Sequence, residues 1–443
     1  MTCMNILLIN SPIRLNARPN NIPYGLAVIA AVLRDHGHSV TIYDINAHRH
    51  GNHEIIDHLK NLQWDVAGIS GLITTYTFQK WLISELKRIC PQAPVISGGG
   101  LATTSYELLF RNSPMDMAVI GEGEATMLAL LHALEQGSSL ETIDGIAFRQ
   151  GNGICLTPQR ANIDNLDSLS FPAWDLLPMD IYLKNPIWGD VASNSSGFRK
   201  DIVITRSMNI ISSRGCPFSC NYCYHLFGKS SYRYRSAQNI IDEMDILVER
   251  YDVDFVGFVD DNMMASEKRL REFCVLLKKK PWKVLWGCHG RVTSAMPEIL
   301  ELMAEAGCVW IGYGIESGSE SMLNAMNKKA DVTAARTAVV NTRKAGIYPN
   351  TTFIFGYPGE TIETIQETID FKKSLDITCG SFFATPYPGT ELYSACRSFI
   401  RDEAAYIESL GDATDYCINL TSFDEQTLFR LKHAQDNLID LKN

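Results

Sequence analysis

Three cysteines stand close together in the segment RGCPFSCNYCY, which covers residues 214–224. They are Cys216, Cys220 and Cys223. A closed structural zinc site requires four ligands, and disulfides join cysteines in pairs, so a set of three fits neither. Three thiolates can instead hold three corners of a [4Fe–4S] cube, because iron–sulfur clusters favour cysteine ligation. The fourth iron is then open to a substrate atom, as in catalytic metal sites.

A zinc site is the main alternative, with His225 as its fourth ligand. The spacing C-x3-C-x2-C followed by C-x-H is unusual for zinc. Three thiols without a metal on one loop would be prone to oxidation. We therefore expect an iron–sulfur cluster here.

The cysteine segment follows a predicted buried strand, residues 208–214, which opens the second half of the chain. A helix over 236–251 comes next, with Ser236 as its expected N-cap. Further β/α steps begin with the apolar runs 253–260, 283–290, 308–316, 347–357 and 377–386. Six such steps predict a partial or complete parallel barrel, whose chemistry lies on loops at the carboxyl ends of its strands.

The first half of the chain also alternates short apolar runs with amphipathic stretches. The predicted strands are 5–10, 39–44, 65–70, 94–100 and 117–124. Strands separated by helices imply a parallel sheet covered on both faces. Ligands of such sheets bind at the carboxyl ends of the strands, here at residues 70–75, 98–100 and 121–124.

The predicted fold class is therefore α/β. A Rossmann-like, doubly wound parallel sheet is expected over residues 1–145, and a partial β/α barrel over 201–390. Between them, residues 146–200 contain a predicted hairpin and a stretch rich in proline and aromatic residues, which we interpret as a linker. Residues 391–443 are expected to form a mostly helical cap.

Composition narrows the function. The net charge is −10 and there is no long basic run, which argues against duplex nucleic acid as a partner. The N-terminus lacks the features of a signal peptide, and the apolar run 26–33 is far too short to span a bilayer. Twelve cysteines without an export signal favour a reducing cytoplasm.

The cysteine segment resembles the C-x3-C-x2-C motif of the radical S-adenosylmethionine (SAM) enzymes. Later segments support the resemblance in the expected order: FVDDNMM (258–264), CHGRVT (288–293), GIESGSE (314–320) and FIFGYPGET (353–361). The resemblance implies that the open iron binds the amino and carboxylate groups of SAM. An electron from the cluster then cleaves SAM to methionine and a 5′-deoxyadenosyl radical.

The resemblance also implies roles for individual residues. Tyr222 can stack on adenine, with a core role as the alternative. Glu316 can accept hydrogen bonds from the SAM ammonium or ribose hydroxyls, and Arg291 can pair with the carboxylate; an ordinary salt bridge is the alternative for both. The remaining expected residues are Ser317 and Gly356 for SAM binding, and Asp260 and Asp261 as catalytic residues at the barrel mouth.

The first half resembles the cobalamin-binding domain that precedes the barrel in one branch of these enzymes. The resemblance rests on segments 21–44, 67–78, 95–105 and 119–126. None of the ten histidines lies in the pattern Asp-x-His-x-x-Gly, which places a histidine under cobalt in many cobalamin proteins. The lower face of cobalt is then expected to meet another group, such as the loop SPIRLNARPN (11–20) or water. The expected cobalamin-binding residues are Ser70, Gly71, Thr74, Thr75, Gly98, Gly99, Gly100, Gly121, Glu122, Gly123 and Glu124.

Two alternatives exist for the first half. Dinucleotide binding would require G-x-G-x-x-G, but GGGLAT lacks the last glycine. A degenerate domain without a ligand is the other alternative.

These features predict a cobalamin-dependent radical SAM enzyme, first of all a methyltransferase. One SAM methylates cobalamin and another yields the radical, which abstracts hydrogen from an unactivated carbon of a small molecule before methylcobalamin delivers the methyl group. An external donor such as a flavodoxin or ferredoxin would reduce the cluster. A cyclase or rearrangement enzyme built from the same parts is the second hypothesis, and a non-catalytic iron–sulfur redox or scaffold protein is the third.

Overall fold

The computed structural model describes residues 3–185, 202–228, 231–411 and 415–441. The chain divides into two compact units. Unit 1 contains residues 1–185 together with 402–410, and unit 2 contains 186–401 and 411–443. The predicted limits at residues 145, 200 and 390 stay predictions. In the described part of the chain, no helix combines the length and apolar character needed to cross a membrane.

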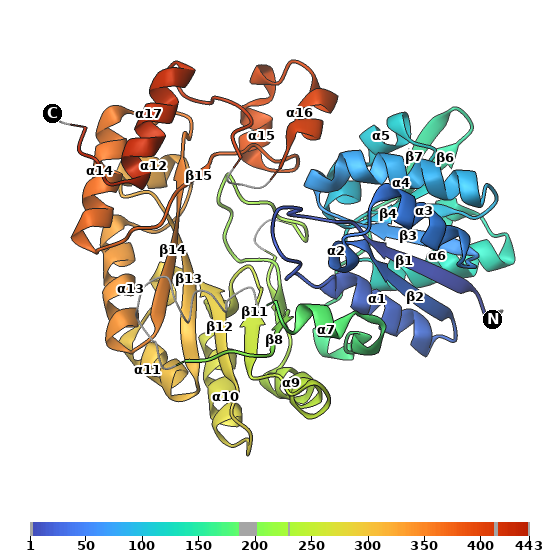
Figure 1. The fold of residues 1–443 in the computed structure, drawn as a ribbon, viewed down its shortest axis with the longest axis horizontal. Helices are drawn as coiled ribbons and strands as arrows, with labels where there is room; N and C mark the ends of the chain where they lie inside the picture. Colours follow the sequence, from blue (N-terminus) through green and yellow to red (C-terminus); the bar gives the residue numbers. More distant parts are fainter. Residues whose placement is uncertain (1–2, 186–201, 229–230, 412–414, 442–443) are drawn as a thin grey trace. The chain divides into compact units, whose positions relative to one another are not determined.

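Unit 1 is built on one sheet with the strand order β2-β1-β3-β4-β5-β6-β7 (Figure 1). The first five strands are parallel, and an antiparallel hairpin continues the sheet beyond β5. The strands are β1 (Asn5–Asn10), β2 (Ser39–Asp44), β3 (Val66–Ser70), β4 (Val95–Gly98), β5 (Met117–Val119), β6 (Ile146–Gln150) and β7 (Gly153–Leu156).

Helices cover both faces of this sheet, as predicted for parallel strands. Apolar side chains of α1 and α6 pack with those of the sheet in one buried cluster, while α4 packs beside α3 and α5. The helices are α1 (Tyr24–Asp35), α2 (Ile45–His48), α3 (Asn52–Lys60), α4 (Tyr76–Ile89), α5 (Gly99–Asn112), α6 (Glu124–Gln136) and α7 (Met179–Tyr182).

The predicted strand 94–100 is shorter in the structure, because β4 ends at Gly98 and α5 begins with Gly99. Gly99 has a φ of +79°. Such a backbone conformation interrupts an extended strand and favours glycine.

Unit 2 contains a six-stranded parallel sheet with the order β15-β14-β13-β12-β11-β8. Neighbours in the sheet are successive along the chain, which confirms the predicted partial barrel. The strands are β8 (Ser207–Ile210), β11 (Phe255–Phe258), β12 (Leu285–Gly290), β13 (Cys308–Glu316), β14 (Tyr348–Phe355) and β15 (Phe382–Phe383).

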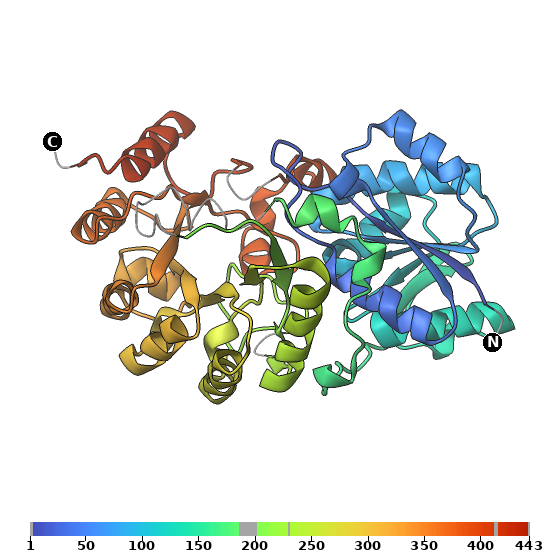
Figure 2. The same ribbon diagram turned by 60° about the horizontal axis from the view of Figure 1, so that its bottom comes forward.

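Helices lie along one face of this sheet (Figures 1 and 2). Several begin at a side-chain cap; the predicted cap Ser236 accepts a hydrogen bond from the amide of Asn239 at 3.2 Å. Buried aromatic rings of Phe258, Phe273 and Trp286 meet edge to face between helix and sheet. The helices are α9 (Ala237–Tyr251), α10 (Glu267–Lys278), α11 (Pro297–Glu305), α12 (Glu320–Ala325), α13 (Val332–Lys344) and α14 (Ile362–Ser374).

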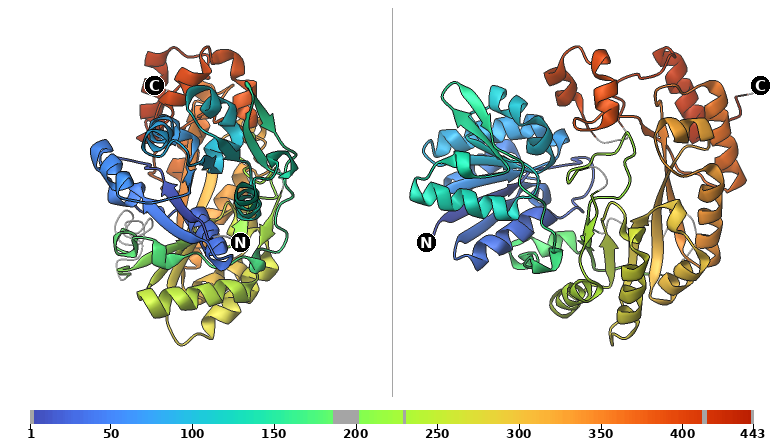
Figure 3. Two further views of the ribbon diagram at one scale, coloured as in Figure 1. Left: turned by 90° about the vertical axis from the view of Figure 1, so that its right-hand side faces the viewer. Right: turned by 180° about the vertical axis from the view of Figure 1, so that it is seen from behind.

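The C-terminal region is mostly helical, as predicted, and is seen from behind in Figure 3. Helices α15 (Glu391–Ala395) and α17 (Glu425–Asp436) belong to unit 2. Helix α16 (Glu403–Ser409) belongs instead to unit 1, where it packs against α4. Lys80 of α4 forms an ion pair with Glu408 of α16.

Candidate functional site

The three clustered cysteines lie on a loop held at its base by two short strands. Strand β9 (Ser213–Arg214) pairs antiparallel with β10 (Arg233–Tyr234). The cysteine loop, residues 215–228, begins at Gly215 with a φ of +78°. A Cβ atom at this position would lie 2.2 Å from the carbonyl oxygen of Ser231, so only glycine fits where the loop leaves its base.

All three thiols are free, and Cys220 is buried. A hydrogen bond from Cys223, together with the positive charges of Lys328 and Arg291, lowers the pKa of the Cys220 thiol, while the same contact and burial raise the pKa of Cys223. Nη1 of Arg291 lies 3.5 Å from Cys220 Sγ. This environment stabilises a thiolate, which is the form that binds metal.

The described residues contain no group of three or more Cys, His, Asp or Glu side chains placed to bind one metal ion. A [4Fe–4S] cube does not require such a group, because each cysteine binds a different iron atom. The three free thiols on one loop therefore fit the predicted cluster.

Tyr222 of the cysteine loop forms a hydrogen-bonded group with Glu316 and Lys328. The Tyr222 hydroxyl donates to Glu316 Oε1 at 2.9 Å. Lys328 Nζ lies 3.0 Å from the same oxygen and 3.1 Å from the Tyr222 hydroxyl. The Lys328 and Glu316 side chains are only 8% and 9% exposed. A carboxylate and an ammonium thus stand side by side, which is complementary to a ligand carrying both of those groups.

Arg291 joins the same region from the end of β12. Its guanidinium lies 3.7 Å from the centre of the Phe218 ring, and Nη2 donates to the carbonyl oxygen of Lys328. Arg291 is buried. The sequence-predicted residues Tyr222, Arg291 and Glu316 therefore gather around the cysteine loop.

Sequence reasoning missed Lys328 and the turn that carries it. This turn docks on the cysteine loop: the Asn221 amide donates to Met326 at 3.1 Å, and Asn327 Nδ2 donates to the Ser219 carbonyl at 2.8 Å. The only signal in the sequence is a polar NKK after a short helix, which is also typical of an exposed turn.

Asp260 is turned towards the start of the cysteine segment. Its carboxylate accepts hydrogen bonds from the amide and hydroxyl of Ser212, both at 3.0 Å, and from the hydroxyl of Ser213. These bonds hold the backbone that leads into the cysteine loop. Loss of hydration and the neighbouring charge of Asp260 raise the pKa of Asp261. Catalytic roles for both aspartates stay predictions.

Asn262 follows the two aspartates and was not singled out from the sequence. Its side chain is fully buried, and neither amide atom has a hydrogen-bond partner among the residues described. An unpaired buried polar group costs about 1–3 kcal/mol. The Asn262 amide is therefore an unsatisfied polar group in the interior of unit 2.

Ser317 and Gly356 occupy different surroundings. The Ser317 hydroxyl is bonded to Thr368 Oγ1 at 3.1 Å, so it ties its loop to α14. The Gly356 amide donates to Glu360 Oε2 at 2.5 Å, and Gly356 has a φ of +77°. These contacts stabilise the local fold around Ser317 and Gly356. SAM binding by these two residues stays a prediction.

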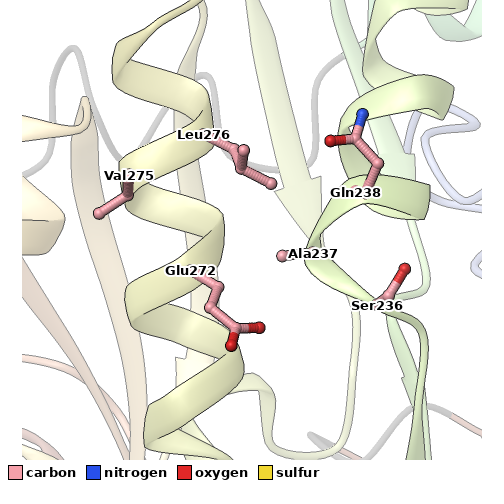
Figure 4. A pocket seen from close by; sticks show the side chains of 6 residues that line it. All are labelled: Ser236, Ala237, Gln238, Glu272, Val275 and Leu276. Carbon is pink, nitrogen blue, oxygen red and sulfur yellow. The ribbon is translucent and has the colours of Figure 1, made fainter.

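The outer helices α9 and α10 leave a hollow of about 310 Å³ between them (Figure 4). Its lining combines the Glu272 carboxylate and polar residues at the start of α9 with apolar side chains of α10. The hollow belongs to the helix layer, and it contains none of the predicted site residues.

In unit 1, the glycine-rich ends of β3 and β4 touch each other. A Cβ atom at Gly99 would lie 3.0 Å from the Gly71 carbonyl oxygen. At Gly98 and Gly121 a Cβ atom would meet nothing within 4 Å. The backbone at the carboxyl ends of β4 and β5 therefore borders open space, which suits close approach of a large ligand.

Other predicted cobalamin residues of unit 1 are engaged within the protein. Thr75 is buried, and its hydroxyl donates to Leu72 and accepts from Gln79. Glu122 Oε2 accepts a hydrogen bond from the Ile163 amide at 2.6 Å. Glu124 is buried in the first turn of α6, whereas positions 70, 74, 100 and 123 are partly exposed.

Two family profiles match the chain. The radical SAM superfamily matches residues 210–371, and the B12-binding domain matches residues 11–131. An uncharacterized methyltransferase of Pyrococcus horikoshii is 32% identical over 402 residues, which cover 89% of this chain and 83% of the relative. The chain belongs to the cobalamin-binding radical SAM enzymes.

Other relatives of this radical SAM enzyme are named as methyltransferases or as cyclases. A cytidylyl-2-hydroxyethylphosphonate methyltransferase of Streptomyces wedmorensis is 28% identical, with 84% of this chain and 77% of the relative covered. An anaerobic magnesium-protoporphyrin IX monomethyl ester cyclase of Rubrivivax gelatinosus is 27% identical, with 84% and 65% covered.

Solved structures share the fold of this radical SAM enzyme. The radical SAM methyltransferase TsrM from Kitasatospora setae has a TM-score of 0.70 and 20% identity, with 90% of this chain and 76% of that chain covered. The cobalamin-dependent radical enzyme OxsB has a TM-score of 0.71 and 17% identity, with 95% and 58% covered.

These findings confirm the predicted enzyme class and its cofactors: a [4Fe–4S] cluster, SAM and cobalamin. The same matches argue against a zinc site at the cysteine loop and against dinucleotide binding by unit 1. The radical SAM match includes the cysteine loop and Arg291, Glu316 and Lys328. The B12-binding match includes the carboxyl ends of β3, β4 and β5.

Proposed function

We propose that this protein transfers a methyl group to an unactivated carbon of a small molecule. The observation that carries the proposal is the combination, in one chain, of a three-cysteine loop flanked by charged groups with a cobalamin-binding unit. The Pyrococcus relative, named a methyltransferase, supports it across most of the chain.

The charged groups beside the cysteine loop suit a zwitterionic amino acid. Glu316 would accept hydrogen bonds from the SAM ammonium, while Arg291 and Lys328 would pair with its carboxylate. The Tyr222 ring would stack against adenine. Cys216, Cys220 and Cys223 would hold the cluster. When bound, the cluster supplies the electron that cleaves SAM, and cobalamin supplies the methyl group.

We further propose that an external flavodoxin or ferredoxin reduces the cluster and that the enzyme works in the cytoplasm. All twelve cysteines are free thiols, which suits a reducing compartment. Three of them are the expected ligands of an oxygen-sensitive cluster.

The second candidate function is cyclisation or rearrangement without methyl transfer, favoured by the Rubrivivax cyclase relative. The mass of the product separates the two functions. Methyl transfer adds one methyl group, whereas cyclisation removes hydrogen and rearrangement leaves the mass unchanged.

The first experiment measures iron and cobalt in anaerobically reconstituted protein that is given hydroxocobalamin and then desalted. We expect about four irons and about one cobalt per chain, from one cluster and one cobalamin. The loaded enzyme is then incubated with SAM labelled on its methyl group and candidate substrates. Label in the product, formed together with 5′-deoxyadenosine, supports methyl transfer.

Absence of 5′-deoxyadenosine with every candidate substrate would count heavily against both catalytic functions. Failure of the cluster-loaded protein to bind SAM in a calorimeter would favour the redox or scaffold hypothesis.

A further inference from the structure

The chain enters unit 1 a second time in its C-terminal region. Residues 402–410, which contain helix α16, belong to unit 1, whereas the residues on either side of them belong to unit 2. The B12-binding match covers residues 11–131 and does not include this segment. Unit 1 therefore contains a helix that lies outside the part of the sequence matched to cobalamin binding.

Helix α16 is anchored by an apolar face. Tyr406, Ile407 and Leu410 are all buried, and Ile407 is only 2% exposed. Side chains at these spacings lie on one face of a helix. The main contacts of α16 are with α4 and with the short helix η1 (Ile73–Thr75), which follows β3. Burial of this apolar face therefore holds α16 against the segment that leads from β3 into α4.

A charged pair joins α16 to the beginning of α4. Glu408 of α16 forms an ion pair with Lys80, which lies in the second turn of α4. The Lys80 ammonium also lies 4.9 Å from the centre of the Tyr76 ring. Tyr76 is the first residue of α4 and is buried. The ion pair thus acts on the end of α4 that adjoins η1.

Hydrogen bonds connect this end of α4 to the expected cobalamin residues. Gln79, which precedes Lys80, is fully buried. Its Nε2 donates to Thr75 Oγ1 at 3.2 Å, and its Oε1 accepts from the Ser97 hydroxyl at 2.9 Å. These bonds join η1, the start of α4 and β4. A shift of α4 would therefore move η1, which carries the expected cobalamin residues Thr74 and Thr75.

Helix α16 is too short to be stable without this packing. It has seven residues, and isolated helices shorter than about 12 residues are marginal in water. Its helical state therefore depends on docking to α4 and η1. By thermodynamic linkage, a ligand that favours the conformation of η1 held by α16 also stabilises the docked helix.

We propose that α16 is a positioning element for cobalamin. Docked through Ile407 and Glu408, it holds η1 and the start of α4 in the conformation that binds the cofactor, without contacting the cofactor itself. The affinity for cobalamin then depends on a helix outside the B12-binding match. This inference rests on cobalamin binding at the carboxyl end of the unit 1 sheet, as in the proposed function.

The first test reverses the charges of the ion pair. Glu408→Lys places a second cation beside Lys80, whereas Glu408→Lys combined with Lys80→Glu restores an attractive pair. The dissociation constant for hydroxocobalamin is measured on cluster-loaded protein by equilibrium dialysis and cobalt analysis. We expect an increase of about fivefold in the single variant, because exposed charge pairs contribute modest energies, and recovery towards the parent value in the double variant.

A matched control reverses a similar glutamate in unit 2. Glu305 forms an exposed ion pair with Lys278 at 2.6 Å. Glu305→Lys therefore makes the same change of charge away from unit 1, and it should bind hydroxocobalamin as the parent protein does.

The second test follows α16 by hydrogen exchange in the parent protein, with and without hydroxocobalamin. The amides of Tyr406 and Leu410 donate to the carbonyls of Asp402 and Ile407. We expect cobalamin to slow their exchange, because binding and docking are linked. Helix α17, which belongs to unit 2, is the internal control, and its exchange should not change.

The third test removes the apolar anchor. Ile407→Ala should speed the exchange of α16 and raise the dissociation constant for hydroxocobalamin by about tenfold, since truncation of a buried isoleucine weakens its packing. Iron content measured on the same samples shows that unit 2 is intact. Ile439→Ala, which truncates an isoleucine that is 47% exposed, is the control and should match the parent protein in both measurements.

Four outcomes would overturn the inference. The first is parent-like affinity for hydroxocobalamin in both Glu408→Lys and Ile407→Ala. The second is a loss of affinity in Glu408→Lys that the double charge reversal does not restore. The third is bound cobalamin that leaves the exchange of α16 unchanged. The fourth is a parent protein that binds no cobalamin; it contradicts the proposed function itself and is thereby distinguished from the other three.

Discussion

The buried pair of Lys328 and Glu316 yields a quantitative prediction. Replacing Lys328 by methionine keeps the length and apolar character of the side chain but removes the ammonium. Glu316 then loses its ionic partner in a site that is about nine-tenths covered. We expect a marked loss of stability in unit 2 of the metal-free protein.

The size of the effect follows from the geometry. At 3.0 Å and an effective dielectric constant of about 20, two unit charges attract by roughly 5 kcal/mol before the cost of desolvation. Removing one partner of a buried pair costs about 3–5 kcal/mol, because the other charge stays buried without compensation. The Tyr222 hydroxyl still donates to Glu316, so we expect the lower end, about 3 kcal/mol.

Urea unfolding of iron-free, reduced protein measures this loss. Trp286 and Trp310 are fully buried in unit 2, and Trp64 and Trp174 are buried in unit 1, so tryptophan fluorescence follows the unfolding of both units. Lys329→Met is the matched control: Lys329 is exposed, and its replacement should change stability by less than about 0.5 kcal/mol. The double variant Lys328→Met with Glu316→Gln should lose less than the sum of the single changes.

Equal midpoints for Lys328→Met and Lys329→Met would refute the reasoning, because the pair would then contribute no more than a surface lysine. Additive effects in the double variant would also contradict it. A calorimetric titration with SAM, performed on cluster-loaded protein, then asks separately whether Lys328 contributes to binding.

Three further predictions follow from individual residues. Cys223→Ala should lose most of the iron, whereas Cys274→Ala, which changes a buried thiol on α10, should retain it. Metal analysis after reconstitution measures the iron content of both variants. Equal iron contents would contradict the assignment of Cys223 as a cluster ligand. Burial raises the pKa of Glu360 from 4.5 to about 8. The unfolded state therefore binds fewer protons between these values, and stability should fall as pH rises through this window, by up to about 1.4 kcal/mol per unit. Glu360→Gln should flatten this dependence in urea midpoints measured from pH 5 to 8, and an unchanged slope would exclude Glu360 as its source. Gly99→Val should abolish cobalt retention, because its Cβ would lie 3.0 Å from the Gly71 carbonyl oxygen. Gly137→Val, also at a positive φ but in open space, should retain cobalt. Equal cobalt retention in the two variants would show that the close contact between Gly99 and Gly71 is not required.

Much of the fold could be predicted from the sequence because apolar periodicity is a local property. Strands β1 and β2 begin and end at the predicted residues, and the hairpin after β5 was also expected. The prediction is wrong at the three glycines 98–100, where the sequence predicts the end of a strand but Gly99 and Gly100 begin α5.

The cysteine motif and its chemistry are determined by the sequence alone. The number and spacing of Cys216, Cys220 and Cys223 are covalent facts, and three thiolates leave one iron open wherever the loop lies. The order of the later segments predicts a SAM site in outline, because the carboxyl ends of successive parallel strands meet at one edge of a sheet.

Only the tertiary structure decided which side chains surround that motif. Lys328 reaches Glu316 and Tyr222 because a turn after α12 docks on the cysteine loop, and Asp260 turns towards Ser212 instead of open space. The sequence likewise places α16 in the C-terminal region, yet it packs with unit 1. Such contacts join residues far apart in the chain, and their direction depends on side-chain packing that no local pattern of polar and apolar residues encodes.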